Sequence, residues 1–210
     1  MIGERLLVSR VIGIVRLDNL DLAVAAATCA IDAGLETIEV TFTLPSAARA
    51  IERIRAARPK AVVGAGTVRR ESELDDAVAA GAQFLVAPGI NPTLFEAAQD
   101  AGVTMLPGVF TASEVDLALR IGANMMKLFP AEPGGPRYMA ALLQPFPAAR
   151  LVPTGGIGPE NAAAYLRAGA AAVAMGTSLF PAQRITSEGP EVAAPLVKKA
   201  LAALATEVTT

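Results

Sequence analysis

Histidine is absent from the 210-residue sequence, and this absence excludes more chemistry than any other feature of the composition. Nucleophilic mechanisms that depend on a Ser–His–Asp or Cys–His arrangement are impossible, and a zinc site would lack its commonest nitrogen ligand. Cysteine occurs once, at Cys29, in a helical pattern that favours a small core residue over a reactive thiol, so no disulfide framework is expected. Proton transfer must therefore rely on carboxylates, lysine, tyrosine or water.

Strong charge of one sign and long apolar runs are also missing. The formal net charge is −2 and the isoelectric point about 5.3, so the chain has no global positive field that would attract nucleic acid or an anionic membrane. Glu4, Arg5 and Arg10 interrupt the apolar residues of the N-terminal segment, unlike the continuous core of a signal peptide. The apolar stretch 168–182 contains Gly, Thr, Ser and Pro and is shorter than the roughly 20 residues of a membrane-spanning helix. We expect a cytoplasmic protein with a small-molecule substrate and with no nucleic-acid or membrane partner.

Eight short runs of β-type residues recur along the chain at intervals of roughly 20 to 26 residues, about the length of one strand, one loop and one helix. The runs cover residues 11–16, 37–42, 61–67, 83–89, 104–108, 125–130, 151–156 and 171–177. Helical patterns between them end directly at a glycine, as a left-handed cap requires. These glycines are Gly34, Gly81, Gly102, Gly122 and Gly169. Helix starts are marked by Asn91-Pro92, by Gly158-Pro159 and by a capping box of Thr111 and Glu114.

The alternation of strand and helix patterns predicts one α/β domain over residues 1–210, with no linker and no low-complexity segment. Eight βα units favour a (β/α)8 TIM barrel, and an open doubly wound sheet is the alternative. In a barrel of this kind the active site is built at the carboxyl ends of the strands. That rule tells us where in the sequence to search for functional residues.

Charged and hydroxyl side chains occur within or at the ends of four of the predicted strands. Arg16 ends the first, Glu39 lies within the second, Thr67 ends the third and Lys127 lies within the sixth. Because side chains alternate along a strand, we expect Glu39 to point to the barrel axis, and Lys127 and Phe129 to point inward together. The plain alternative is a buried ion pair of Glu39 and Lys127 without a catalytic role.

Lys127 is surrounded by apolar neighbours, which disfavour its ammonium form and leave more of it as a free amine. A free amine can attack a ketone and form a Schiff base, whose iminium accepts electrons when the adjacent C–C bond breaks. Glu39, directly or through a water molecule, can move the protons that these steps need. The pair therefore predicts class I aldol chemistry, which requires no metal and no other cofactor.

Glycine-rich segments follow the last two predicted strands, at the loops where barrels of this type commonly bind phosphate. Either motif alone is a weak signal, because tight turns need glycine for ordinary steric reasons. Together they indicate a phosphate site. The candidate residues are Thr154, Gly155, Gly156, Thr177 and Ser178.

Eight segments in this order, GIVR, IEVTFTLPSA, VGAGTV, FLVAPGINP, MLPGVFTASE, MKLFPAE, VPTGGI and MGTSL, resemble the 2-keto-3-deoxy-6-phosphogluconate (KDPG) / 4-hydroxy-2-oxoglutarate (KHG) aldolases over nearly the whole chain. The resemblance implies a homotrimeric barrel that cleaves KDPG to pyruvate and D-glyceraldehyde 3-phosphate, with KHG as a further substrate. It also implies that Lys127 forms the Schiff base and Glu39 is the acid–base group. The residues it implies at the pyruvate end are Thr67, Pro88 and Phe129, and those near the phosphate are Thr154, Gly155, Gly156 and Ser178.

Thr43 departs from the pattern of the family, because some members carry an arginine there that holds the substrate carboxylate. Arg16 is the candidate replacement, since a guanidinium can bind a carboxylate through two hydrogen bonds. The alternative is that Arg16 lies at the bottom of the barrel or forms a surface ion pair. The departure also leaves open 2-keto-3-deoxy-6-phosphogalactonate (KDPGal) as the substrate.

Two other classes of protein stay open on the sequence. A phosphosugar isomerase or epimerase, or a transferase similar to thiamin-phosphate synthase, would share the phosphate loops of the barrel but would not need a reactive lysine in the sixth strand. A barrel that serves only as a binding or assembly module would need neither Lys127 nor Glu39.

Overall fold

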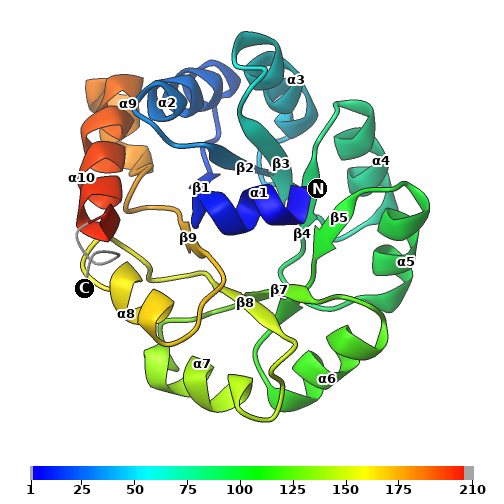
Figure 1. Cartoon of the computed structure of the whole chain (residues 1–210). Coiled ribbons are helices and arrows are strands. Elements are labelled where there is room, and N and C mark those ends of the chain that lie inside the picture. The colour runs from blue at the N-terminus through cyan, green and yellow to red at the C-terminus, as the bar shows by residue number, and fades with distance from the viewer. Residues whose placement is uncertain (1, 206–210) are drawn as a thin grey trace.

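A computed structural model describes residues 2–205 of the chain, with helices arranged around a set of strands (Figure 1). The strands are β1 (Val11–Val15), β2 (Thr37–Thr41), β3 (Val62–Gly66), β4 (Phe84–Val86), β5 (Thr104–Leu106), β6 (Gly108–Val109), β7 (Met125–Leu128), β8 (Arg150–Pro153) and β9 (Val173–Met175). The helices are α1 (Ile2–Ser9), α2 (Leu20–Asp32), α3 (Ala47–Ala57), α4 (Glu71–Ala79), α5 (Pro92–Asp100), α6 (Ala112–Arg120), α7 (Gly135–Leu143), α8 (Ala162–Arg167), α9 (Ala182–Glu188), the 3-10 turn η1 (Pro190–Val192) and α10 (Ala193–Ala205). Within this part of the chain no helix is long and apolar enough to cross a membrane.

The strands pair in parallel and form two curved sheets in an α/β fold. One sheet has the order β5-β4-β3-β2-β1-β9 and the other β6-β7-β8. All the predicted runs contain strands, but the run 104–108 is split into β5 and β6, which is a correction to the single strand expected there. Pro107 explains the break, because it has no backbone N–H to donate to a neighbouring strand. Between the sheets, Thr154 and Ala174 form an isolated parallel bridge, so β8 also approaches β9.

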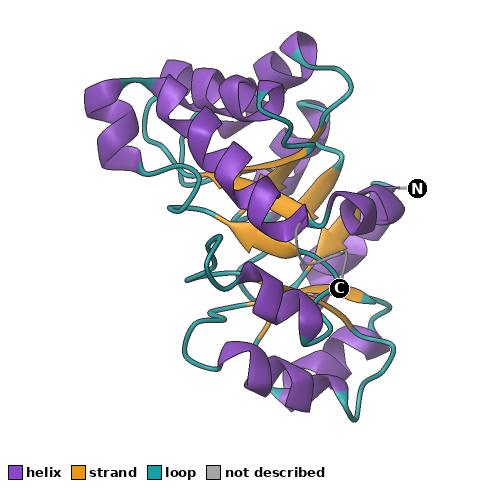
Figure 2. Cartoon of the chain, turned by 60° about the vertical axis from the view of Figure 1, so that its left-hand side comes forward, coloured by secondary structure: helices purple, strands orange, loops and turns teal. Residues whose placement is uncertain are grey.

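Side chains alternate between two apolar layers, as the pleat of a strand requires. On β2, Ile38 and Val40 belong to the outer layer between strands and helices. The inner layer lies among the strands and fills the space they surround, so the interior is a packed core. Its members are Leu6, Ile12, Ile14, Val62, Phe84, Val86, Leu106, Met125, Val152, Ala172 and Ala174. In a second view the strands again lie inside, with helices outside them (Figure 2).

Helix α1 was not expected from the sequence. It crosses the centre of the view in Figure 1 and inserts Leu6, which is 0% exposed, into the inner layer. The Thr37 hydroxyl, on the first residue of β2, donates to the Ser9 hydroxyl at 3.0 Å. Arg5 donates to the carbonyl of Lys60, shortly before β3, at 2.7 Å. The helix therefore covers the amino-terminal end of the strands and leaves the carboxyl end for the site.

Most of the predicted helix boundaries are confirmed. The five capping glycines have positive φ angles between 69° and 108°, and Thr111 and Glu114 form the complete capping box of α6. Helix α8 is a correction, because it begins at Ala162 and not at Pro159. The side chain of Asn161 accepts a hydrogen bond from the amide of Gly158 and donates one to the carbonyl of Gly156, which holds this segment as a turn.

Candidate active site

A cavity of about 560 Å³ lies at the carboxyl ends of β1, β7, β8 and β9, where the architecture predicts a site. The residues that line it are Ile14, Arg16, Lys127, Phe129, Glu132, Thr154, Gly155, Gly156, Ile157, Glu160, Gly176, Thr177, Ser178, Phe180 and Ala182. Most of the residues predicted from the sequence are therefore brought together. Glu39, Thr67 and Pro88 are not part of the cavity wall.

Lys127 lies near the carboxyl end of β7, paired with Gly108 of β6 and Val152 of β8. It is 3% exposed, and its Nζ atom lies 4.9 Å from the centroid of the Phe129 ring. Burial lowers the pKa of Lys127; the charge of Glu39 opposes this shift and the charge of Arg16 adds to it. The amine form is therefore more abundant than in a surface lysine.

Glu39 is 1% exposed and lies on β2, opposite Gly64 of β3. Its carboxylate covers Gly66, where an added Cβ would collide with Oε1, so a side chain at this position would displace Glu39. Within residues 2–205 the Oε1 atom has no hydrogen-bond partner. Burial raises the pKa of Glu39, and the charges of Lys127 and Arg16 oppose this shift.

The buried ion pair that the sequence left open is not formed among the described residues, because no Lys127 nitrogen lies within 4.0 Å of a Glu39 oxygen. The two groups attract each other, but burial outweighs that attraction in both pKa shifts. The amine form of Lys127 and the protonated form of Glu39 are therefore easier to reach than in exposed groups of the same kind. Such a pair can exchange protons during a reaction.

Arg16 is exposed at the end of β1 and lines the cavity on the side of Lys127. Its charge acts on both Glu39 and Lys127. In the described part of the chain its guanidinium takes part in no ion pair, so the surface ion-pair alternative has no partner there. Thr43 is also exposed, outside the cavity wall, with its hydroxyl 2.7 Å from that of Thr41.

The other end of the cavity is built from loop backbone. Gly155 and Gly156 have φ angles of 92° and 72°, a backbone conformation that residues with a side chain rarely adopt. Among the described residues, the amides of Gly156, Thr177 and Ser178 donate to no backbone carbonyl. The Ser178 hydroxyl donates to the carbonyl of Ile157 at 2.8 Å. The amides are therefore available to an anion, whereas the Ser178 proton already has an acceptor.

Glu132 and Glu160 line this end of the cavity and were not predicted from the sequence. A Cβ added at Gly156 would lie 2.6 Å from the Cβ of Glu132, so these two residues are in close contact. Both glutamates lie in irregular segments, where neither strand nor helix period predicts the direction of a side chain. The position of Glu132 soon after the lysine strand, in KLFPAE, was the available signal.

Thr67 and Pro88 follow the neighbouring strands β3 and β4. Thr67 is half-buried and has a φ angle of 59°, which is unusual for a residue with a side chain. It directly follows Gly66, the residue that the Glu39 carboxylate covers. The carbonyl of Pro88 packs against Gly108 of β6. Thr67 is therefore beside the carboxylate, although outside the cavity wall.

Comparisons with known proteins agree on one family. A family model described as "Aldolase: KDPG and KHG aldolase" matches residues 2–194. The 2-dehydro-3-deoxy-phosphogluconate aldolase of Treponema pallidum (strain Nichols) is 41% identical over 179 residues, 85% of each chain. The 2-dehydro-3-deoxy-6-phosphogalactonate aldolase of Escherichia coli (strain K12) is 35% identical over 180 residues, 85% of this chain and 88% of that one. A crystal structure of KDPG aldolase from Legionella pneumophila, with pyruvate captured as a covalent carbinolamine, has a TM-score of 0.87 and 32% identity and covers 94% of this chain and 97% of that one.

Proposed function

The chain belongs to the KDPG and KHG aldolase family and is a lyase, and on this premise we propose that it is a class I aldolase in which Lys127 forms the Schiff base. The proposed reaction is the reversible cleavage of KDPG to pyruvate and D-glyceraldehyde 3-phosphate, with 4-hydroxy-2-oxoglutarate as a further substrate. The observation that carries the proposal is a lysine that is 3% exposed, at the carboxyl end of a strand, with its pKa lowered by burial.

Lys127 begins the proposed reaction as a neutral amine. Its Nζ atom attacks the C2 ketone of the substrate to give a carbinolamine, which loses water to form an iminium. A base removes the proton of the C4 hydroxyl, the C3–C4 bond breaks, and its electron pair moves into the iminium as an enamine while the aldehyde leaves. The enamine is protonated at C3, and water then releases pyruvate and the free amine.

Glu39 is the proposed carrier of these protons. Burial raises its pKa, which suits a group that must both accept and donate a proton during the reaction. A water molecule beside Oε1, the buried oxygen without a partner, would extend its reach to the cavity. Because Glu39 does not line the cavity wall, we propose that it acts through such a water.

The substrate is proposed to lie with its carboxylate toward Arg16 and its phosphate toward the loops after β8 and β9. Arg16 is supported by its position on the cavity wall and by its lack of an ion-pair partner within residues 2–205. The amides of Gly156, Thr177 and Ser178 support the phosphate end. Phe129 packs against the Lys127 amine, whereas contacts of Thr67 and Pro88 with pyruvate stay predictions.

We further infer that residues 1–210 form a single domain, in which the two sheets close into one (β/α)8 barrel. The bridge of Thr154 to Ala174 supports closure on one side, and the continuous chain through Pro107 supports it on the other. A homotrimer, a cytoplasmic location and the absence of a cofactor are predictions that the family likeness supports in part. The covalent intermediate captured in the Legionella enzyme supports chemistry through the protein's own amine.

KDPGal is the second candidate substrate. Thr43, which stands where some relatives carry an arginine, and the 35% identity to a 2-dehydro-3-deoxy-6-phosphogalactonate aldolase both favour it. Measuring kcat/KM for KDPG and KDPGal with the same preparation decides between them. We expect the higher value for KDPG.

Borohydride trapping tests the proposed function. The protein is incubated with pyruvate and reduced, and the adduct is mapped by mass spectrometry. We expect a reduced pyruvate adduct on Lys127 and no aldol cleavage by Lys127→Ala. An adduct on another residue, or full activity in Lys127→Ala, would contradict the proposal. EDTA should leave the activity intact, so a strict metal requirement would count against class I chemistry.

A further inference from the structure

The loop of residues 67–70 connects β3, beside the Glu39 carboxylate, to helix α4. The residue before this helix is Arg70, whose side chain does not cap the helix. This is an unusual choice, because Ser, Thr, Asp or Asn normally supplies an oxygen there for the unpaired amides. Some other group must therefore hold this end of the loop.

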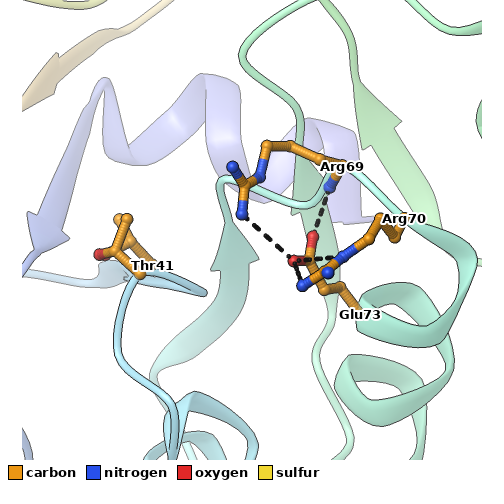
Figure 3. A network of polar contacts seen from close by, with 5 residues as sticks. Thr41, Arg69, Arg70 and Glu73 are labelled. Atoms are coloured by element: carbon orange, nitrogen blue, oxygen red, sulfur yellow. Dashed lines mark hydrogen bonds and ion pairs between the residues drawn. The ribbon is translucent and has the colours of Figure 1, made fainter.

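Glu73, in the first turn of α4, accepts hydrogen bonds from the loop that precedes the helix. Its Oε2 atom accepts a hydrogen bond from the backbone amide of Arg69 at 2.7 Å. Its Oε1 atom accepts from Nε and from one terminal nitrogen of Arg70, at 3.1 and 2.6 Å. Figure 3 shows the carboxylate between the Arg69 backbone and the Arg70 guanidinium. Glu73 thus connects the helix to the loop that precedes it.

Glu73 is 5% exposed, whereas the side chains of Arg69 and Arg70 are mostly exposed. Burial alone raises the pKa of Glu73, but the hydrogen bonds from Arg69 and Arg70 and their charges outweigh it and lower the pKa. The carboxylate is therefore ionised at neutral pH. An ionised and buried acceptor with several donors holds its donors firmly, because an unmatched charge there would be costly.

Thr67, at the other end of the same loop, has the conformation that most needs such support. A φ angle of 59° places a residue with a side chain in a sparsely populated and strained region of backbone conformation. The amide of Val68 donates to the carbonyl of Val86 at 3.1 Å, which fixes the loop on its β4 side. Glu73 accepts from the amide of the next residue, Arg69, so the two residues after Thr67 are each held by a backbone hydrogen bond.

Helix α6 shows how the same carboxylate is used with an ordinary cap. Glu114 occupies the equivalent position in α6 and accepts from the amides of Phe110 and Thr111 at 2.8 and 2.7 Å. In α6 the Thr111 hydroxyl also accepts a hydrogen bond from the amide of Glu114, so two side chains connect the helix to its loop. In α4 no N-cap side chain bonds to the helix, so Glu73 is the side chain that connects the helix to its loop. That loop, unlike the loop before α6, contains a predicted pyruvate contact, Thr67.

We propose that Glu73 is a positioning residue for the aldolase site, which holds residues 67–70 so that Thr67 keeps its left-handed conformation beside the Glu39 carboxylate. The proposal rests on the proposed function, because Thr67 matters for catalysis only if its side chain faces bound pyruvate. Glu73 itself touches neither the cavity wall nor Lys127. Its effect must therefore appear in substrate binding through Thr67.

Glu73→Ala tests the proposal through the KM for KDPG cleavage, measured beside thermal unfolding. We expect KM to rise about tenfold and kcat to change little, because misplacement of a contact residue weakens binding before it affects Lys127. Glu73→Gln, which keeps an acceptor for the Arg69 amide, should show a smaller rise of about threefold and serves if Glu73→Ala does not fold. Glu114→Ala is the matched control, with a similar loss of Tm and an unchanged KM.

Two double variants separate positioning from helix stability. In Arg70→Asn/Glu73→Ala the asparagine can cap α4, so Tm should recover while KM stays high. In a cycle with Thr67→Ala, the loss of Glu73 should add no further rise in KM, because the contact it positions is already gone. The proposal would be overturned if KM were unchanged in both single Glu73 variants. It would also be overturned if KM recovered together with Tm in Arg70→Asn/Glu73→Ala, or if the effects of Glu73→Ala and Thr67→Ala on KM were additive. Failure of the proposed function would instead appear as a missing Lys127 adduct in the unaltered protein.

Discussion

The two ends of the cavity are built from different parts of the chain. At one end, Lys127 on β7 lines the cavity and is 3% exposed, and Glu39 on β2 lies outside the wall and is 1% exposed; both strands have a neighbour on each side. At the other end, Gly155 and Gly156 belong to a loop, and what they offer to the cavity is backbone. The first end is fixed by the sheet, and the second by the φ angles of two glycines.

This difference assigns different tasks to the two ends. A buried amine and a buried carboxyl group have shifted pKa values, which is what proton transfer and nucleophilic attack require. Loop amides carry no titratable proton, so they can bind an anion over a wide pH range but cannot transfer a proton to the substrate. We expect substitutions at the lysine end to reduce kcat and those at the loop end to change substrate preference.

The largest difference between the two ends is expected when one carboxylate is replaced at each of them. Glu39→Gln keeps the shape of the side chain but cannot carry a proton, so kcat/KM for KDPG cleavage should fall by about 10²–10⁴-fold. Glu132→Gln makes the same chemical change at the loop end and should lose less than about tenfold. Steady-state kinetics of both variants provide the measurement. Equal losses would mean that the two ends are not divided as we describe.

An intermediate effect is expected for Gly156→Ala. The new methyl group would meet Glu132, and the φ angle of 72° would be strained, so the loop should move and weaken phosphate binding by about 10- to 100-fold in KM. KHG cleavage and pyruvate trapping, which need no phosphate site, should change little. Gly102→Ala is the control, because it has a similar φ angle of 69° and open space around it. An equal loss with KHG would show that the loop supports the lysine end as well.

The smallest effect is a shift in pH dependence. The charge of Arg16 lowers the pKa of Lys127, so Arg16→Ala should raise that pKa and leave less free amine at a given pH. The acid side of the pH profile for borohydride trapping with pyruvate should therefore move to higher pH. Arg16→Lys, which keeps the charge, should leave the profile in place while KM rises through loss of the two-point grip. If the pH profiles of Arg16→Ala and Arg16→Lys did not differ, the charge of Arg16 would have no effect on Lys127.

The sequence predicted the strand-borne part of the site better than the loop-borne part. Lys127 and Glu39 could be placed because the pleat makes direction follow from position along a strand. Glu132 and Glu160 could not, because loop residues have no such period. The split at Pro107 and the late start of α8 are consequences of single prolines and side-chain hydrogen bonds, which a pattern of residue types does not resolve.

Helix α1 escaped prediction for a different reason. It is eight residues long, too short to be stable alone, and it forms because Leu6 enters the inner layer. The apolar cluster that Leu6 enters also contains residues distant in sequence, such as Val62 and Ala172. Such a helix can be predicted only when the arrangement of the strands is known, because tertiary packing stabilises it.

The same helix has a consequence for the order of events in a turnover. With α1 and the inner layer filling the amino-terminal end, a substrate approaches Lys127 from the carboxyl end of the strands, and its products return by that route. In the proposed pose, the aldehyde fragment would lie nearer the loops and the pyruvate fragment would be attached to Lys127. We therefore expect ordered release, with the aldehyde first and pyruvate second, so that in the synthetic direction pyruvate must bind before its partner.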